Sequence, residues 1–308
     1  MTQESWTVTG PQIIDLERVT TLDAKVIGGR IDVVAHHDPA RTDARLEVHS
    51  VTGRPLEVRV EGSTLHVGYG SFGAGWKGFL ERFHSYTGKD AADVHVAVPV
   101  TARVKVATVQ GEALVAGVRE DVRLGTVTGS VMTSRTEGEL RVDTVSGDVS
   151  ASEHDGPVRM DSVSGSLTAT GALRSLHLDS VSGAVTVDTR TTPGEVVVNA
   201  ISADVLVRLP DPDAMDYAIR CVSGRLLVDG AEQHRTTGSF ARAPRGGRGA
   251  PVRVSAVSGD VTVLRGTPED GYGTEDAPVA AEDDAVGSPV WGSPGARDAA
   301  PASGPEDL

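Results

Sequence analysis

Apolar and polar residues recur along this chain in a unit of 18 residues. The repeated segments are TVQGEALV, TVTGSVMT, TVSGDVSA, SVSGSLTA and SVSGAVTV, beginning at Thr108, Thr126, Thr144, Ser162 and Ser180, followed at wider spacings by AISADVLV, CVSGRLLV and AVSGDVTV from Ala200, Cys221 and Ala256. An internal period of this length is typical of repeat proteins in which each unit stacks on its neighbour and covers its apolar face.

Four positions of the unit are apolar in every copy. We number them from position 0, which is held by Gly111, Gly129, Gly147, Gly165, Gly183, Ala203, Gly224 and Gly259. The apolar columns are −7, −5, −2 and +2, and within each arm they alternate with polar residues, as strands with one buried face do. We therefore expect all four columns in the core, including Val127, Val145 and Val163 at −2. The change of parity between −5 and −2 predicts a bulge or a corner there, and the Gly predicts a bend at positive φ.

These patterns predict an all-β protein, a single-stranded β-solenoid that resembles a parallel β-helix, with coils of about 18 residues over residues 101–264. Residues 5–100 are expected to form an irregular all-β N-terminal cap and the first coils. Leu22 to Val33 matches the columns, Leu46 to Gly53 matches half of them, and 56–67 predicts a hairpin. The alternating segment 94–98 predicts the strand that enters the regular array.

Composition narrows the classes of protein that remain. The 308 residues carry a formal charge of −14, which disfavours binding to nucleic acid or to anionic membranes. One cysteine permits no internal disulfide, and no apolar run is long enough for a transmembrane segment. Residues 265–308 are acidic, rich in proline and poor in branched aliphatics, so we expect a disordered tail. The absence of a signal-peptide pattern favours the cytoplasm, with the cell surface or membrane association as the alternative.

Two insertions interrupt the repeat and are candidates for function. Within residues 68–90, Trp76, Phe79, Leu80 and Phe83 have the spacing of one apolar helix face. These four residues are the candidate partner-docking site, although a segment that shields an open end of the solenoid would have the same composition. Residues 230–251 contain Arg235, Arg242, Arg245 and Arg248 among Gly and Pro and predict a surface loop.

No residue of the repeat is a candidate for catalysis, for cofactor binding or for metal binding. The Ser before each Gly recurs in five units, whereas a catalytic Ser is singular and needs an adjacent base, so these hydroxyls are expected to bind backbone groups. A flat hydroxyl ladder for ice binding is the alternative. Asp143, Asp161, Asp179 and Asn199 form a further column at −4, which we expect to face solvent beside Arg residues.

The serial TVSGDV, SVSGSL, SVSGAV and AVSGDV units, with VHVAVPV before them and ESWTVTGPQIIDLERV at the start, resemble the bacterial β-strand-repeat "putative adhesin" family of unknown function. The resemblance covers about residues 5–264. It implies a β-solenoid without established catalytic residues and an adhesin-like role, and some members are linked to envelope stress. The expected function is therefore non-catalytic binding of an unknown protein or envelope component.

Two alternatives remain open at this point. The first is a cytoplasmic scaffold, associated with envelope stress, that docks on a membrane protein. The second is a carbohydrate-active β-helix enzyme, a class in which carboxylates gather on long loops over one face. The corners between Thr108 and Val187 are too short to form the walls of such a cleft, so the sequence favours a binding protein over an enzyme.

Overall fold

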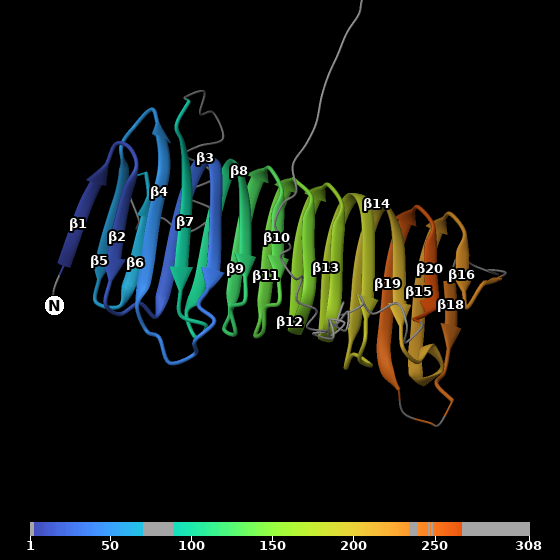
Figure 1. The fold of residues 1–308 in the computed structure, drawn as a ribbon. Coiled ribbons are helices and arrows are strands. Elements are labelled where there is room, and N and C mark those ends of the chain that lie inside the picture. Colours follow the sequence, from blue (N-terminus) through green and yellow to red (C-terminus); the bar gives the residue numbers. More distant parts are fainter. Residues whose placement is uncertain (1–2, 70–88, 234–238, 246, 248, 267–308) are drawn as a thin grey trace, which may run out of the picture. The chain divides into compact units, whose positions relative to one another are not determined.

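The computed structural model describes residues 3–69, 89–233, 239–245, 247 and 249–266, which all belong to one compact unit (Figure 1). The elements are β1 (Gln3–Val8), β2 (Gln12–Leu16), β3 (Thr21–Ala35), β4 (Ala44–Thr52), β5 (Leu56–Glu61), β6 (Thr64–Gly68), β7 (Ala91–Val98), β8 (Arg103–Ala116), β9 (Val122–Thr128), β10 (Val131–Ser134), β11 (Leu140–Ser146), β12 (Val149–Ser164), β13 (Leu167–Thr189), β14 (Val196–Leu209), the 3-10 helix η1 (Pro212–Ala214), β15 (Met215–Ser223), β16 (Leu226–Val228), β17 (Ala231–Glu232), β18 (Ser239–Arg242), β19 (Ala250–Ser258) and β20 (Val261–Arg265). The described part of the chain is thus almost entirely β, as predicted.

Successive coils stack in parallel and in register. β11 lies between β9 and β12, so that Val142 has Leu124 on one side and Met160 on the other. β10 likewise lies between β8 and β12. Each coil has a first arm before the position-0 corner and a second arm after it, and like arms pair from coil to coil. The predicted single-stranded β-solenoid with coils of about 18 residues is confirmed.

Three of the four predicted apolar columns line the core between the two arms. In one coil, Leu140 at −7, Val142 at −5 and Val149 at +2 are all buried. The first arm continues its alternation for one more step, so that Thr144 at −3 is also buried, and the second arm adds Ala151 at +4. The core is therefore aliphatic along its length, with a row of small or hydroxyl-bearing side chains next to the corner.

From Val145 onward the fourth column does not lie in the core, and the sequence prediction is wrong there, although Val109 at the start of the column is buried. Val145, Val163 and Val181 at −2 are 38%, 50% and 41% exposed, although Val127 packs partly against the core. The reason is that the first arm alternates without a bulge through −3, which is buried, so −2 points outward. The change of parity occurs in the corner between −2 and +2.

The corner itself is the closest approach between neighbouring coils. Gly165 has a φ of 119°, and a Cβ built on it would lie 2.4 Å from the carbonyl oxygen of Gly147. Gly183 repeats this arrangement against Gly165, at 2.1 Å with a φ of 118°. The predicted bend at positive φ is confirmed at Gly129, Gly165, Gly183, Gly224 and Gly259 but not at Gly111, Gly147 or Ala203, and at Gly165 and Gly183 the stacked backbone leaves no room for a side chain.

Hydroxyl groups complete the hydrogen bonds of the corner. The Oγ of Ser162 at −3 donates to the carbonyl oxygen of Ser164 at 3.3 Å. The Oγ of Ser164 at −1 donates to the carbonyl oxygen of Val145 in the preceding coil at 3.2 Å, and Ser182 makes the same bond to Val163. These bonds confirm the structural role predicted for the hydroxyls. The hydroxyl stripe of the ice-binding alternative lacks one of its two rows on the surface, because the −3 hydroxyls are buried.

At the N-terminal end, β3 is the first coil of the solenoid. It pairs in parallel with β8, with Leu22 opposite Val104 and Gly29 opposite Gly111, as the column match of Leu22 to Val33 predicts. The chain between these strands folds over the free side of β3, where β6 and β7 pair with it in parallel. Antiparallel strands then extend this cap outward from β6 through β5 to β1.

Two sequence interpretations of the cap have different outcomes. The hairpin predicted for residues 56–67 is formed by β5 and β6. The half match of Leu46 to Gly53 to the repeat is wrong, because β4 runs antiparallel to both β2 and β7 and is therefore no coil of the solenoid. Parallel and antiparallel strands both show alternation of apolar residues, so the alternation does not indicate in which direction a strand runs.

At the C-terminal end, the order of the coils in space differs from their order in the chain. β19 and β20 pair with β14 on one side and with β15 and β16 on the other (Figure 1). The last repeat of the sequence therefore lies between the two repeats that precede it, whereas the sequence predicts each coil on its predecessor. The spacing of 35 residues gives the chain enough length to pass around one coil and return.

The insertion at 230–251 contains strands in its described part, where the sequence predicts a loop. β18 pairs antiparallel with β15, and β17 with β16, so both cover the outer edge of the last coil. Asp213 of η1 forms ion pairs with two segments at this end, because its Oδ2 lies 3.0 Å from Nη2 of Arg265 and 3.4 Å from Nη1 of Arg245. The aromatic segment 70–88, most of the 265–308 tail and residues 234–238 lie outside the described residues.

We predict that Gly165→Ala destabilises the protein, because the added methyl group meets the Gly147 carbonyl and φ is strained. The expected loss is about 1–3 kcal/mol of unfolding free energy, measured as a lower urea midpoint. Gly10→Ala is the control, since nothing lies within 4 Å of its Cβ position, and it should change stability by less than about 0.5 kcal/mol. Equal midpoints for the two variants would contradict the packing described here.

A buried histidine makes stability depend on pH. His154 is 1% exposed, and its Nδ1 forms a 3.0 Å hydrogen bond with Thr136 Oγ1. Burial lowers the pKa of His154 below its usual 6.5, because the charged imidazolium is poorly solvated there. The unfolded chain therefore binds a proton more readily than the folded chain, and unfolding is favoured as the pH falls below about 6.5.

We expect the urea midpoint of the wild-type protein to fall between about pH 7.5 and about pH 5.5, and to fall less in His154→Gln, which has no titrating imidazole at this position. The difference between the two pH values is the quantity to compare, because the substitution itself also changes stability. His37→Gln, at an exposed position, should keep the wild-type pH dependence. An unchanged pH dependence in His154→Gln would refute the assignment.

Candidate functional site

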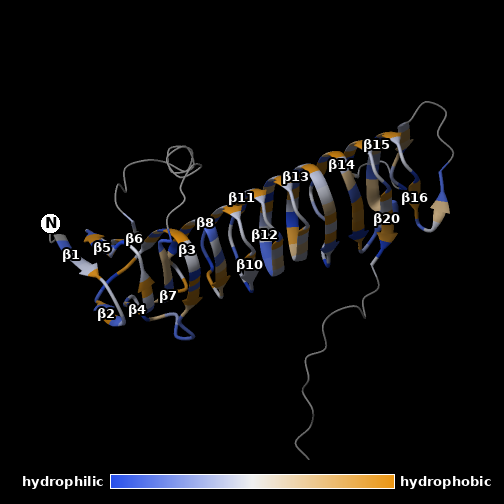
Figure 2. Cartoon of the chain, turned by 90° about the horizontal axis from the view of Figure 1, so that it is seen from above, coloured by the Kyte–Doolittle hydropathy of each residue, from blue (hydrophilic) through white to orange (hydrophobic). Residues whose placement is uncertain are grey.

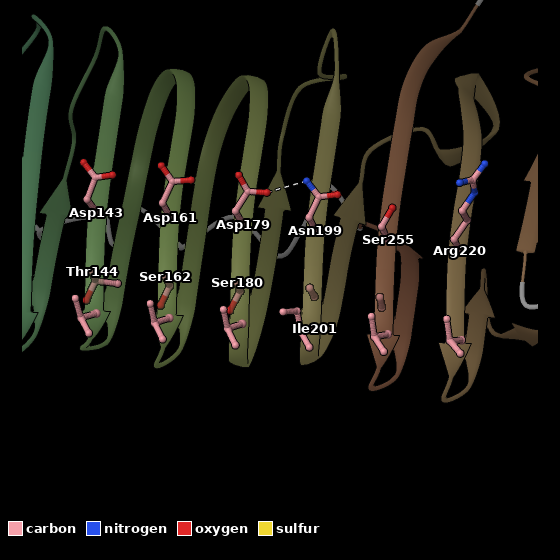
Figure 3. Close-up of a pocket in the computed structure, with 17 residues that line it drawn as sticks. Asp143, Thr144, Asp161, Ser162, Asp179, Ser180, Asn199, Ile201, Arg220 and Ser255 are labelled. Carbon is pink, nitrogen blue, oxygen red and sulfur yellow. Dashed lines mark hydrogen bonds between the residues drawn. The ribbon is translucent and has the colours of Figure 1, made fainter.

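The outer surface of the first arms carries a groove that runs across several coils. We call this surface the first-arm face; it comprises residues 140–146, 158–164, 176–182, 196–202, 252–258 and 215–223. Side chains at −4 and −2 form the two walls of the groove, and the −3 residues form its floor (Figure 3). The groove has a volume of about 710 Å³. It is the candidate functional site because it joins charged and apolar rows that the core does not use.

One wall of the groove is a ladder of carboxylates. Asp143, Asp161 and Asp179 stand opposite one another in register on successive coils. The guanidinium of Arg141 lies 3.4 Å from the Oδ2 of Asp143 and 3.5 Å from that of Asp161. The guanidinium of Arg159 lies 3.4 Å from the Oδ2 of Asp161 and 3.9 Å from that of Asp179. The ladder beside Arg residues that the sequence predicts is therefore present, and each carboxylate has a cationic partner.

The ladder changes its chemistry toward the C-terminal end. The next residue is Asn199, whose Nδ2 donates a 2.7 Å hydrogen bond to Asp179 Oδ1 (Figure 3). Ser255 follows Asn199, and Arg220 follows Ser255, because β19 lies between β14 and β15. The wall is thus acidic at one end, neutral in the middle and basic at the other end. The sequence did not show this order, since Arg220 precedes Ser255 in the chain.

The central carboxylate is the most perturbed member of the ladder. Partial burial raises the pKa of Asp161 above its usual value, and the neighbouring Asp143 acts in the same direction. Arg159 opposes this shift by stabilising the carboxylate. At Asp161, burial and the like charge of Asp143 are therefore only partly offset by Arg159.

The other wall is a row of exposed aliphatic side chains, which we call the aliphatic ladder. In spatial order it consists of Val145, Val163, Val181, Ile201, Val257 and Val222. The exposed fraction of these side chains lies between 38% and 53% from Val145 to Val257 and reaches 76% at Val222. With strands about 4.8 Å apart, six rungs extend over about 24 Å. Figure 2 shows hydrophobic segments at the same point of successive coils from β8 to β15.

A continuous exposed apolar row of this kind is typical of a binding surface. On the floor, Ser162 and Ser180 donate to backbone carbonyl oxygens within their own corners, so these two hydroxyls are not activated nucleophiles. Among the described residues, no cluster of three His, Cys, Asp or Glu side chains is arranged to hold a metal ion. The arrangement is suited to recognition by shape, apolar contact and charge.

The sequence-based docking candidates cannot be compared with this groove. Trp76, Phe79, Leu80 and Phe83 lie outside the described residues, and their docking role stays a prediction. The aliphatic ladder was missed because an apolar column in a repeat was assigned to the core. The −3 column is compatible with such a ladder, because its small residues continue the buried parity of −7 and −5, but hydropathy alone does not decide whether −3 or −2 is buried.

Among the described residues, no helix is long and apolar enough to cross a membrane. No curated protein matches the chain in sequence. Three solved structures are similar to it at low identity. A "putative cell adhesion protein" from Clostridium sporogenes is 11% identical, covering 86% of this chain and 99% of that chain, with a TM-score of 0.27.

The second, a "putative adhesin" from Bacteroides fragilis, is 14% identical over 82% of this chain and 96% of that chain, with a TM-score of 0.35. The third, a "putative lipid binding protein" from Parabacteroides distasonis, is 10% identical over 83% and 97%, with a TM-score of 0.37. Similarities of this size carry no functional argument. The family model described as Toastrack DUF4097 matches residues 30–264, about three quarters of the sequence. This match agrees with the resemblance seen in the VSG repeats, and the chain belongs to the Toastrack DUF4097 family.

Proposed function

We propose that this protein is a non-catalytic binding or scaffold protein that engages a macromolecular partner through the first-arm face. The observation that carries the proposal is the aliphatic ladder, in which Val163, Ile201 and Val257 are each at least half exposed. Isolated exposed aliphatic residues are ordinary, whereas six in consecutive register form one continuous apolar strip.

The structure also supports binding rather than turnover at this groove. Ser162 and Ser180 in the groove donate to backbone carbonyl oxygens, and Asp143 and Asp161 pair with Arg141 and Arg159. The corners beside the groove are formed by a few residues around Gly147, Gly165 and Gly183, so they add no wall that would enclose a substrate. A flat, repetitive surface of this kind recognises another extended surface more readily than a small molecule.

Two placements in the cell fit this proposal and differ in their partners. An adhesin-like protein would meet its partner at the cell surface, and a cytoplasmic scaffold would dock on a membrane protein from inside. The exposed aliphatic ladder serves either role. Its acidic neighbours Asp143, Asp161 and Asp179 disfavour a bare anionic lipid surface as the partner.

We predict that Val145→Ser, Val163→Ser and Val181→Ser combined abolish partner binding and leave the fold intact. All three side chains are exposed, so thermal unfolding should shift by less than a few degrees. A photoreactive amino acid at position 163 should yield a crosslinked partner in cells, identified by mass spectrometry. The same probe at Thr168, on the outer side of the second arm of the same coil, is the matched control.

The proposal fails if position 163 gives no more crosslinked product than position 168, or if the triple variant retains the product. Destabilisation of the triple variant would leave the single-site crosslinking comparison to decide, because that comparison needs no loss of fold.

Cell fractionation separates the two placements. A cytoplasmic scaffold should be recovered in the cytosol or on the inner face of the membrane, protected from protease added to intact cells. An adhesin-like protein should be degraded by the same treatment. A known cytoplasmic protein and a known surface protein of the same cells serve as controls, and recovery of this chain with the surface protein would exclude the scaffold placement.

A further inference from the structure

The row of residues at −4 has a polarity that makes the first-arm face self-complementary. In spatial order it is Asp143, Asp161, Asp179, Asn199, Ser255 and Arg220 (Figure 3). The side chain of Arg220 is exposed and makes no ion pair with another described residue. The row therefore has three carboxylates at one end and an unpaired guanidinium at the other.

If two copies of the first-arm face meet with their −4 rows in opposite order, every residue of the row faces a residue with which it can pair. Asp143 then meets Arg220, Asp161 meets Ser255 and Asp179 meets Asn199. These are an ion pair, a hydroxyl–carboxylate pair and an amide–carboxylate pair, and no two carboxylates stand opposite each other. The reversal corresponds to a twofold axis that lies in the interface, parallel to the strands, between the rungs of Asp179 and Asn199.

The spacing of the rungs favours a second solenoid over an extended peptide. Neighbouring coils repeat about every 4.8 Å, whereas side chains on one face of an extended peptide repeat about every 6.8 Å and lose register after two or three residues. Only a partner with the same repeat keeps the aliphatic ladder in contact along its length. In the reversed arrangement Val145 meets Val222, Val163 meets Val257 and Val181 meets Ile201.

We propose that the occupant of the first-arm face is a second copy of this chain, bound antiparallel across a twofold axis. This inference rests on the proposed binding role of the same face and names its partner. An isologous contact of this kind is the commonest symmetry of homo-oligomers. Surfaces of nucleic acid or anionic lipid would meet the carboxylate end with like charge.

The size of the face sets the strength of the association. Six rungs span about 24 Å, and the arm from −6 to −1 spans about 17 Å, so each copy buries about 400 Å². This is below the area of a stable dimer, and association should be weak and dependent on concentration. The −6 row brings Arg159 opposite Arg253, but each already pairs within its own copy, with Asp161 and Glu195 respectively.

The test is a charge-reversal exchange with the full chain, followed by sedimentation velocity over a range of concentrations at about 0.15 M salt. The wild-type chain should shift from monomer toward dimer as its concentration rises. Asp143→Arg and Arg220→Asp should each weaken association by about tenfold or more, because each places like charges together twice in the dimer. An equimolar mixture of the two variants should restore association, since the mixed dimer has two opposite-charge pairs.

Arg119→Glu and Glu137→Arg are the control pair, because these residues form a 3.3 Å ion pair at the opposite corner of the coils. Neither should change association, and their mixture should behave as each does alone. Circular dichroism and thermal unfolding of every variant establish that it is folded. If Asp143→Arg does not fold, Asp143→Asn replaces it and should weaken association, with partial restoration by Arg220→Asp, because the mixed dimer has one opposite-charge pair and neither variant alone has any.

A wild-type chain that stays monomeric at every soluble concentration would overturn the inference. Single reversals without effect would also overturn it, and so would two weakened variants that fail to restore each other. The proposed binding role is judged separately, because a monomeric chain whose position 163 still crosslinks to a different macromolecule keeps that role and loses the second copy as its partner. Crosslinks to the chain itself, with restoration in the mixture, support both.

Discussion

Backbone-to-backbone stacking at the position-0 corner is the constraint on which the rest of the structure depends. At most corners a Cβ on the position-0 residue would lie 2.0–2.4 Å from a carbonyl oxygen of the neighbouring coil, as Gly165 shows against Gly147 at 2.4 Å. Glycine permits this approach, in five coils at a φ that other residues resist, and Ala203 is the one position-0 residue with a Cβ. The close approach locks neighbouring coils in register, and every column of the repeat follows from that register.

Register has a second consequence outside the core. Whatever stands at an outward position in one coil is repeated directly beside itself in the next, so a single surface Val becomes a strip and a single Asp becomes a ladder. The aliphatic ladder lowers the stability of the fold little, because water contacts each of its residues, and it concentrates exposed apolar area in one line. In the carboxylate ladder, neighbouring like charges repel each other, and Arg141 and Arg159 offset this repulsion by bridging neighbouring rungs.

At both ends of the solenoid, segments that depart from the repeat cover the strand edge that stacking would leave unpaired. At the N-terminal end, the chain leaves β3 and returns as a cap before β8 resumes the stack. At the C-terminal end, β19 enters between β14 and β15, and the antiparallel β18 covers the outer edge. The same exchange of coil order places Arg220 at the end of the ladder, and it thereby creates the polarity of the first-arm face.

The 18-residue period, the alternation within each arm and the Gly column determined the solenoid, because in-register stacking needs only identical neighbours. The hydroxyl bonds at Ser162 and Ser164 also followed from the recurrence of hydroxyl residues at −3 and −1 in most units. Sequence could not decide which way Val145 faces, since a buried Thr144 and a buried Val145 give equally regular columns. Nor could it order Arg220 after Ser255. Those two outcomes were decided by the path of the corner and by pairing between distant segments, which depend on three-dimensional packing rather than on local pattern.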